Sequence, residues 1–139
     1  MSDNKATMQR VYEEIFSQGK LDVIDELLAD DFVEHEELPP GIPPGKESPR
    51  ALVGMLRNAF PDFRATVEEM LEDGDKVIIR ARFSGTHQGE FMGIPPTGKK
   101  FDVAVIDIIE FRDGKGIAHW GVIDMAAMMQ QLGIGGPPA

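Results

Sequence analysis

The chain has 139 residues, of which 42% are hydrophobic, so it is long enough for one domain with a sizeable core. Its formal net charge of −10 disfavours nucleic acids and anionic membrane surfaces as partners. The sequence contains no cysteine, which excludes disulfides, thiolate metal sites and cysteine nucleophiles.

The residues that open the chain lead into an amphipathic segment rather than an apolar one, so they do not resemble a signal peptide. The apolar stretches are far shorter than the ~20 residues that a membrane span needs. We therefore expect a soluble cytoplasmic protein.

Apolar residues recur at helical spacing in three segments of the first part of the chain. Ser48 is a favourable N-cap for the third helix, Pro49 a favourable first residue, and Pro61 closes it. Before this helix lies a loop whose four prolines and two glycines forbid regular structure. We predict helices over residues 5–18, 21–28 and 48–60, a short extended piece over 32–35, and the loop over 38–46.

The period of the pattern then changes from helical to two, which is typical of strands. Asp73-Gly74 and Asp113-Gly114 are turn signals between alternating segments. We predict strands over residues 63–71, 77–84, 101–111 and 117–123, a loop over 89–100, and a terminal helix over 125–132. A single domain over residues 1–134 would then be followed by a flexible tail over 135–139.

Helices followed by antiparallel strands predict the α+β class. We expect a cone in which a curved antiparallel sheet packs on about three helices and the open end forms an internal apolar pocket. The segment from Asp102 to Phe111 is largely apolar on both strand faces, so both should be covered. A homodimer through the outer sheet face would cover the second; the alternative is coverage by the chain itself.

The sequence has no P-loop, GxGxxG, HExxH or GxSxG pattern. Candidate residues are therefore polar side chains among apolar ones. Asp124 follows the last strand and, by alternation, shares a face with Trp120. A carboxylate beside an aromatic wall in a dry pocket suits a general base. The alternative is that Asp124 caps the helix beginning at Met125, and the two interpretations predict opposite pKa shifts.

The three histidines are candidates of different kinds. His119 points away from the Asp124 face unless a bulge intervenes, and an ordinary hydrogen-bonded role is the alternative. His35 ends the short extended piece beside the proline-rich loop, where functional groups concentrate. His87 continues the inward face of Phe83 and could form part of a pocket wall. Their separation gives no metal-ligand spacing, so we expect no metal.

Two other polar residues lie on faces that we expect to be buried. Asp107 is the only charge among the apolar residues of its strand face, which include Ile109. An unpaired carboxylate there would be unstable, so Asp107 is either a pocket acid or half of a buried pair with an arginine. Tyr12 lies on the inward stripe of the first helix, where it either donates a hydrogen bond in the pocket or packs in the core.

Three segments resemble the SnoaL-like polyketide (ester) cyclase family. Residues 85–99 are similar to the family's GTHxGxFxGIPPTGK segment, residues 113–124 to its DGKIxEHWxxxD segment, and residues 131–133 to its closing QLG. With the Tyr12–Phe16 helix and the Phe32–His35 piece, the match covers nearly the whole chain. The chain departs from the family's pattern at Glu110, where arginine is usual, and at Ala118, where glutamate is usual.

The resemblance implies an NTF2-like cone, commonly a dimer, without a metal or an organic cofactor. Characterised members close a polyketide ring by intramolecular aldol condensation of an ester substrate. Their acid–base aspartate maps to Asp124, a pocket histidine to His35, and the aromatic wall to Trp120.

We therefore predict a cofactor-free enzyme that removes a proton α to a carbonyl of a hydrophobic ester or polyketide-like ligand. Asp124 is the expected base, with His35 or His119 assisting it. The expected ligand contacts are Trp120, Tyr12, Phe83, His87, Phe91 and Ile109.

Two alternatives stay open. An isomerase or hydrolase on the same cone would use Asp107 with Asp124 as two pocket carboxylates. A non-catalytic small-molecule-binding domain is favoured by the departures at Glu110 and Ala118, since fold alone does not fix function.

Overall fold

The computed structural model describes residues 2–134, so the predicted tail over 135–139 lies outside the described residues. The elements in chain order are α1 (Asp3–Arg10), η1 (Val11–Ser17), η2 (Leu21–Val23), α2 (Ile24–Leu27), β1 (Leu28–Glu34), α3 (Glu47–Ala59), β2 (Arg64–Asp73), β3 (Lys76–Thr86), β4 (Lys100–Arg112), β5 (Lys115–Ile123) and α4 (Met125–Leu132).

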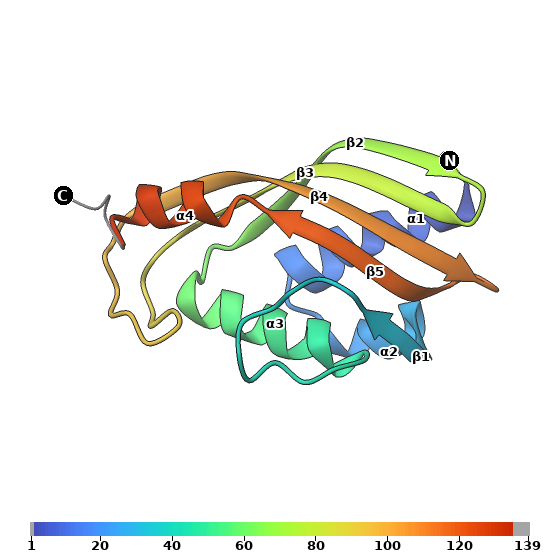
Figure 1. Cartoon of the computed structure of the whole chain (residues 1–139), viewed down its shortest axis with the longest axis horizontal. Coiled ribbons are helices and arrows are strands. Elements are labelled where there is room, and N and C mark those ends of the chain that lie inside the picture. Colours follow the sequence, from blue (N-terminus) through green and yellow to red (C-terminus); the bar gives the residue numbers. More distant parts are fainter. Residues whose placement is uncertain (1, 135–139) are drawn as a thin grey trace.

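The strands form one five-stranded sheet in the order β1-β5-β4-β3-β2. Neighbouring strands are antiparallel except β1, which runs parallel to β5. The sheet curves over α1, α2 and α3, which lie on its inner face, while α4 follows β5 at one end (Figure 1). The predicted α+β cone is confirmed.

The four predicted strands are present, each slightly longer than expected, and the short extended piece is part of a fifth strand. This strand, β1, begins at Leu28 and therefore shortens the second predicted helix. Leu28 and Ala29 are both buried, and the pairing with β5 shifts between Leu28 and Val33. This irregularity breaks the period-two pattern that marks the other strands.

The first predicted helix is present but changes its winding at Val11. α1 continues as the π-helix η1, whose wider turn is uncommon and often found at functional sites. Tyr12 and Phe16 lie on its inward side with their rings stacked at 5.8 Å. The change of winding thus brings a phenol and an aromatic ring to the inner face of the sheet.

The prediction that Ser48 caps the third helix is wrong. α3 begins one residue earlier, at Glu47, and the backbone N–H of Ser48 already donates to Gly45 O at 3.0 Å. The hydroxyl of Ser48 is buried and has no hydrogen-bond partner among the described residues.

The turn between β4 and β5 is at Asp113-Gly114, as predicted. Both residues have positive φ, 53° and 81°, which is the backbone of the two-residue hairpin turn that matches strand twist. The pairing of β4 with β5 starts at this turn and shifts by one residue between Phe111 and Glu110, and the shifted register places Ile109 opposite His119.

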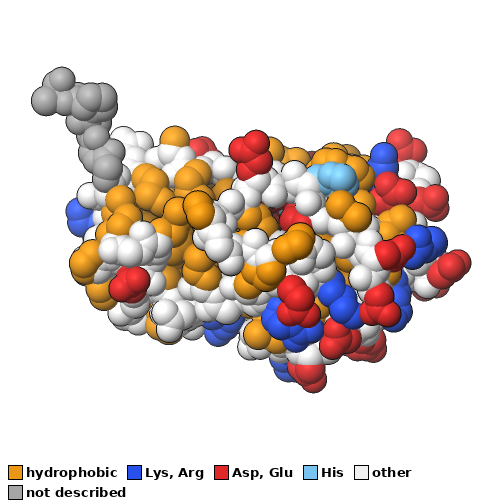
Figure 2. All heavy atoms as spheres, turned by 60° about the horizontal axis from the view of Figure 1, so that its bottom comes forward, with side chains coloured by type: hydrophobic (Ala, Val, Ile, Leu, Met, Phe, Trp, Pro, Cys, Tyr) orange, Lys and Arg blue, Asp and Glu red, His pale blue; other side chains and the backbone are white. Residues whose placement is uncertain are grey.

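The inward faces of the strands and the helices enclose one hydrophobic core. On the face seen in Figure 2, hydrophobic side chains gather at one end and charged side chains at the other. Within residues 2–134, no helix is long and apolar enough to cross a membrane.

Candidate functional site

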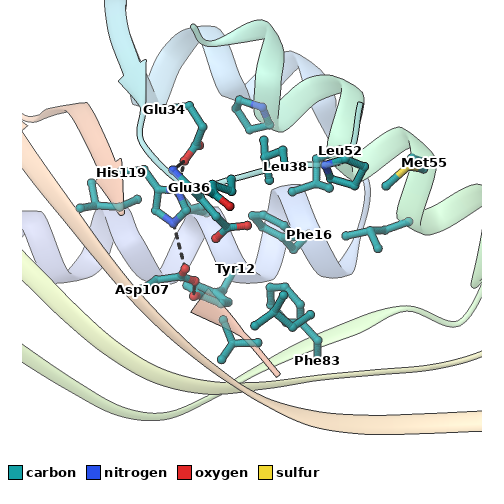
Figure 3. A pocket seen from close by; sticks show the side chains of 18 of the residues that line it. Tyr12, Phe16, Glu34, Glu36, Leu38, Leu52, Met55, Phe83, Asp107 and His119 are labelled. Carbon is teal, nitrogen blue, oxygen red and sulfur yellow. Dashed lines mark hydrogen bonds and ion pairs between the residues drawn. The ribbon is translucent and has the colours of Figure 1, made fainter. Parts of the chain in front are cut away.

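A cavity of about 90 Å³ lies between the inner face of the sheet and the helices. Most of its wall is apolar, and one end is polar (Figure 3). The apolar wall includes Phe16, Phe32, Leu52, Met55, Phe83 and Met128. Glu36, Glu37, Leu38 and Pro39, which follow β1, also border the cavity, so the segment between β1 and α3 contributes to it.

The polar end is built by the register of β4 and β5. Asp107 pairs with Gly121, and Ile109 pairs with His119. Asp107 and His119 are therefore diagonal neighbours on the inner face, where long side chains reach each other. Gly121 has no side chain, so the space opposite Asp107 stays open for polar groups.

Four side chains form a chain of hydrogen bonds at this end. The hydroxyl of Tyr12 donates to Asp107 Oδ2. Asp107 Oδ1 lies 2.8 Å from His119 Nε2, and His119 Nδ1 lies 2.5 Å from Glu34 Oε1 (Figure 3). The partners of Asp107 are thus a histidine and a tyrosine, not the arginine that the sequence left open.

The two flanking carboxylates hold His119 in its charged form. Burial alone would lower the pKa of the imidazole, but hydrogen bonds to Asp107 and Glu34 raise it to about 10. At neutral pH both ring nitrogens therefore donate, and a positive charge lies at the polar end of an apolar cavity. Burial, followed by the charge of Asp107, raises the pKa of Tyr12 well above its ordinary value, so its hydroxyl stays protonated.

Glu36 extends the polar end from the segment after β1. Its side chain points toward Asp107 and His119 (Figure 3). One ligating atom from each of Glu36, Asp107 and His119 lies within 4.8 Å of the others, a spacing compatible with a metal ion. However, the Asp107 and His119 atoms already bond each other, so the structure accounts for them without one.

The predicted placement of Asp124 in the pocket is wrong. β5 ends at Ile123, and Asp124 is exposed at the N-cap of α4, where its Oδ1 accepts from the Ala127 N–H at 3.0 Å. The structure has the capping arrangement that the sequence left as the alternative. Asp124 and Asp107 do not form a carboxylate pair, since only Asp107 borders the cavity.

The predicted placements of His35 and Trp120 at the pocket are also wrong. Alternation along β5 turns His119 inward and Trp120 outward, so Trp120 lies on the outer sheet face. His35 is exposed and stacks on the Trp120 ring at 4.7 Å with the planes 3° apart. Lys76 Nζ lies 5.5 Å from the same ring, which suits a cation–π contact.

His87 is buried, as expected, but behind the cavity rather than on its wall. Thr97 donates its backbone N–H to His87 Nδ1 at 3.2 Å, and the His87 ring packs against Phe60 and Phe91. The backbone N–H of His87 donates to Lys99 O, and its carbonyl accepts from the Gly98 N–H. These hydrogen bonds hold the two ends of the loop between β3 and β4 together.

The remaining predicted ligand contacts, Tyr12, Phe83, Phe91 and Ile109, all border the cavity. Three cavity carboxylates, Glu34, Glu36 and Glu37, were missed. A signal for the first two was present, because alternation from the inward Phe32 puts residues 34 and 36 on the same side.

Comparison with known proteins gives matches over most of the chain. A family model described as SnoaL-like polyketide cyclase matches residues 6–132. Nogalonic acid methyl ester cyclase of Streptomyces nogalater is 29% identical over 119 residues, covering 85% of this chain and 89% of that protein. Aklanonic acid methyl ester cyclase DauD of Streptomyces sp. strain C5 is 32% identical over 128 residues, covering 86% and 76%.

Solved structures give the same picture of the fold. TsrD from Streptomyces laurentii matches with a TM-score of 0.84 at 27% identity, covering 94% of this chain and 95% of that one. Wild-type IdmH from Streptomyces antibioticus matches with a TM-score of 0.82 at 35% identity, covering 96% and 100%.

Proposed function

Because the chain belongs to the SnoaL-like polyketide cyclase family, we propose that it closes a ring in a hydrophobic, polyketide-like ester by acid–base catalysis at the Asp107–His119 end of its cavity. The observation that carries this proposal is the hydrogen-bonded chain of Tyr12, Asp107, His119 and Glu34 at the border of an otherwise apolar cavity. Perturbed titratable groups in an apolar pocket are a signature of catalytic sites.

The charges around the cavity favour a neutral substrate. Glu34, Glu36, Glu37 and Asp107 border it, His119 is the one basic residue, and neither lysine nor arginine is among its described lining residues. A free carboxylate would enter a site where acidic side chains outnumber the one cation, His119, which is already paired with Asp107 and Glu34. An ester avoids this penalty, which agrees with the ester substrates in the names of the two curated relatives.

The proposed chemistry begins with loss of a proton α to a carbonyl. The enolate that forms carries negative charge on oxygen, and the His119 imidazolium supplies the opposite charge in an apolar setting where it acts strongly. Asp107 and Glu34 keep His119 charged and oriented, while Tyr12 holds Asp107. The acid–base work thus falls to side chains of this cavity.

Substrate entry requires the cavity to widen. A pocket for a drug-sized ligand usually measures about 300–1,000 Å³, whereas this cavity measures about 90 Å³. The segment between β1 and α3, which contributes Leu38 and Pro39 to the wall, has no helix or strand to hold it. We assign the widening to this segment.

We propose that the active protein is a homodimer whose two copies meet through the outer face of the sheet. Ile106, Ile108, Trp120 and Val122 form an apolar strip on β4 and β5, and Ile106 and Val122 are 45% and 71% exposed. Arg80 and Glu69 pair beside it on β3 and β2, so this face carries both signs of charge and can complement its own copy.

The test is turnover of nogalonic or aklanonic acid methyl ester, followed by chromatography and mass spectrometry. Asp107→Asn removes the charge that holds His119, and we expect turnover to fall by about 10²–10³-fold, as when a group that stabilises developing negative charge is lost. Asp124→Asn is the matched change at the exposed cap, where asparagine also caps helices, and we expect turnover close to wild type.

The opposite pattern, with turnover lost in a folded Asp124→Asn protein and kept in Asp107→Asn, would overturn this choice of site. Tight binding of either ester by the wild type without ring closure would favour the non-catalytic binding domain instead.

A further inference from the structure

We propose that Glu36 is the general base of the reaction, taking the α-proton from carbon and returning it to oxygen. This inference rests on the proposed function and adds a residue that neither the sequence motifs nor the relatives' names assign.

The other polar groups of the cavity are already engaged with one another. Both carboxylate oxygens of Asp107 accept hydrogen bonds, one from Tyr12 and one from His119. Both ring nitrogens of His119 are bonded, and Glu34 Oε1 accepts from His119 and from the Glu36 backbone N–H. A proton placed on Asp107 or on Glu34 Oε1 would disrupt the contacts that hold His119, and His119 with both nitrogens bonded has no lone pair to offer.

Glu36 differs from these groups. Within residues 2–134, no hydrogen bond or ion pair satisfies its carboxylate. That carboxylate is only partly buried, borders the cavity, and points toward Asp107 and His119 (Figure 3). A methyl group at Gly121 would collide with both Glu36 Oε1 and Asp107 Oδ1, so the glycine leaves the space that the free carboxylate occupies.

The electrostatic surroundings match this role. Burial raises the pKa of Glu36 to about 7, with the positive charge of His119 opposing the rise and the negative charges of Asp107 and Glu34 adding to it. The other ionisable groups bordering the cavity are Tyr12, which stays protonated, and Glu37, which is exposed. A general base is most effective when its pKa lies near the working pH.

The reaction needs only one group that accepts a proton and later returns it, and Glu36 can do both. The Glu36 carboxylate accepts a proton from the carbon α to the ester or ketone carbonyl, and the C–H electrons become the enolate. The α-carbon forms a bond to a second carbonyl carbon of the same molecule, and that carbonyl oxygen becomes an alkoxide. The alkoxide takes the proton back from Glu36, so the product is an isomer of the substrate and the enzyme is restored.

Two assays on one set of variants test the inference. The first follows ring closure of aklanonic acid methyl ester. The second follows exchange of the α-protons of methyl benzoylacetate, a neutral aromatic keto ester, into D₂O by NMR. Glu36→Gln keeps the shape and removes the base, while Glu72→Gln makes the same change at an exposed residue outside the cavity.

We expect Glu36→Gln to lower both rates by about 10²–10⁴-fold with ligand affinity retained, and Glu72→Gln to leave both unchanged. In the wild type, kcat/KM should rise with pH through about 7, as Glu36 loses its proton. The residual kcat/KM of Glu36→Gln should not show this rise with pH.

The outcomes separate the two proposals. If Glu36→Gln closes the ring within threefold of wild type, Glu36 is not the base and the proposed function stands. If the wild type exchanges α-protons but closes no ring, and Glu36→Gln does neither, the base is supported and the cyclase is overturned. A wild type inactive in both assays overturns both.

Discussion

Burial acts in opposite directions on the two titrating groups at the polar end of the cavity. It raises the pKa of Glu36 and lowers that of His119, because it disfavours the charged form of each. Only His119 has carboxylates within hydrogen-bond distance that overcome burial. The result is a permanent cation beside a carboxyl group that changes charge near neutral pH.

This arrangement predicts a pH-dependent effect of Glu36→Gln on stability. The folded-state pKa of Glu36 is raised from 4.5 to about 7, so its contribution to stability is fully present below pH 4.5 and is lost as the pH rises through about 7. Glutamine has no charge to bury. We expect the variant to gain Tm relative to wild type between pH 5 and pH 8, measured by calorimetry.

Glu72→Gln removes one negative charge at an exposed residue and is the control. It should show no such gain in Tm relative to wild type. A Glu36→Gln Tm difference that is the same at pH 5 and pH 8 would contradict the burial of a titrating carboxyl group in the cavity.

Gly121 gives a second prediction at the residue scale. A Cβ there would collide with the carboxylates of Glu36 and Asp107 and press on the His119 ring. We expect Gly121→Ala to displace these groups and to lower turnover by about 10²-fold, the effect of a misplacement of about 1 Å. Steady-state kinetics checks this.

Gly54→Ala is the matched control, because a Cβ on this α3 residue meets nothing within 4 Å. It should keep full activity and gain about 0.5–1 kcal/mol in the free energy of unfolding, since alanine favours a helix interior. Equal turnover in the two alanine variants would contradict the role given to Gly121.

Strand alternation in the sequence placed some candidate residues correctly and others wrongly. Asp107 lies inside a long regular strand, so its inward face followed from its apolar neighbours. Asp124 was assigned to the face of Trp120, which is the outer face of β5, and it lies one residue past the strand, where the backbone turns into a helix cap. The link from Asp107 to His119 depends on strand register, which one sequence does not contain.

At the scale of elements, the sequence predicted best where its period was regular. β2 to β5 alternate and are separated by turn residues, so their order and type followed directly. β1 does not alternate at its start, and it pairs with β5, nearly ninety residues later in the chain. The π-helical winding of η1 was not predicted, because the apolar residues of this segment recur at ordinary helical spacing.

The start of α3 provides a prediction at this scale. Ser48 lies inside the helix with its hydroxyl buried and without a partner among the described residues. Removing a buried, unsatisfied hydroxyl relieves a desolvation penalty of about 1–3 kcal/mol, partly offset by lost packing. We expect Ser48→Ala to be neutral or to raise the free energy of unfolding in urea by up to about 1 kcal/mol.

Ser2, whose hydroxyl caps α1 by accepting from Lys5 N–H at 3.2 Å, is the contrasting serine. Ser2→Ala should destabilise by about 1 kcal/mol. A similar loss in Ser48→Ala would mean that Ser48 caps α3 after all.

At the scale of the whole molecule, the two faces of the sheet have different tasks. The inner face holds the cavity and its charged end, and helices cover it (Figure 1). The outer face presents Ile106, Val122 and Trp120 to solvent, although a monomer usually keeps such apolar strips small. The His35–Trp120 stack, displaced from its predicted catalytic place, belongs to this outer face.

The outer face predicts how the chain assembles. We expect the wild type to have the mass of a dimer by native mass spectrometry and analytical ultracentrifugation. Ile106→Glu places a charge in the middle of the apolar strip, where burial without a partner costs several kcal/mol per ion, so the variant should be monomeric. Met92→Glu makes the same kind of change at an exposed methionine in the loop between β3 and β4, away from the strip, and should stay dimeric.

Because Ile106 points away from the cavity, a monomeric Ile106→Glu protein should retain the Glu36 titration even if its turnover falls. Loss of that titration together with the dimer would mean that the partner copy helps to shape the cavity. A wild type that has the mass of one chain, or an Ile106→Glu variant that remains dimeric, would show that the outer face of the sheet is not where two copies meet.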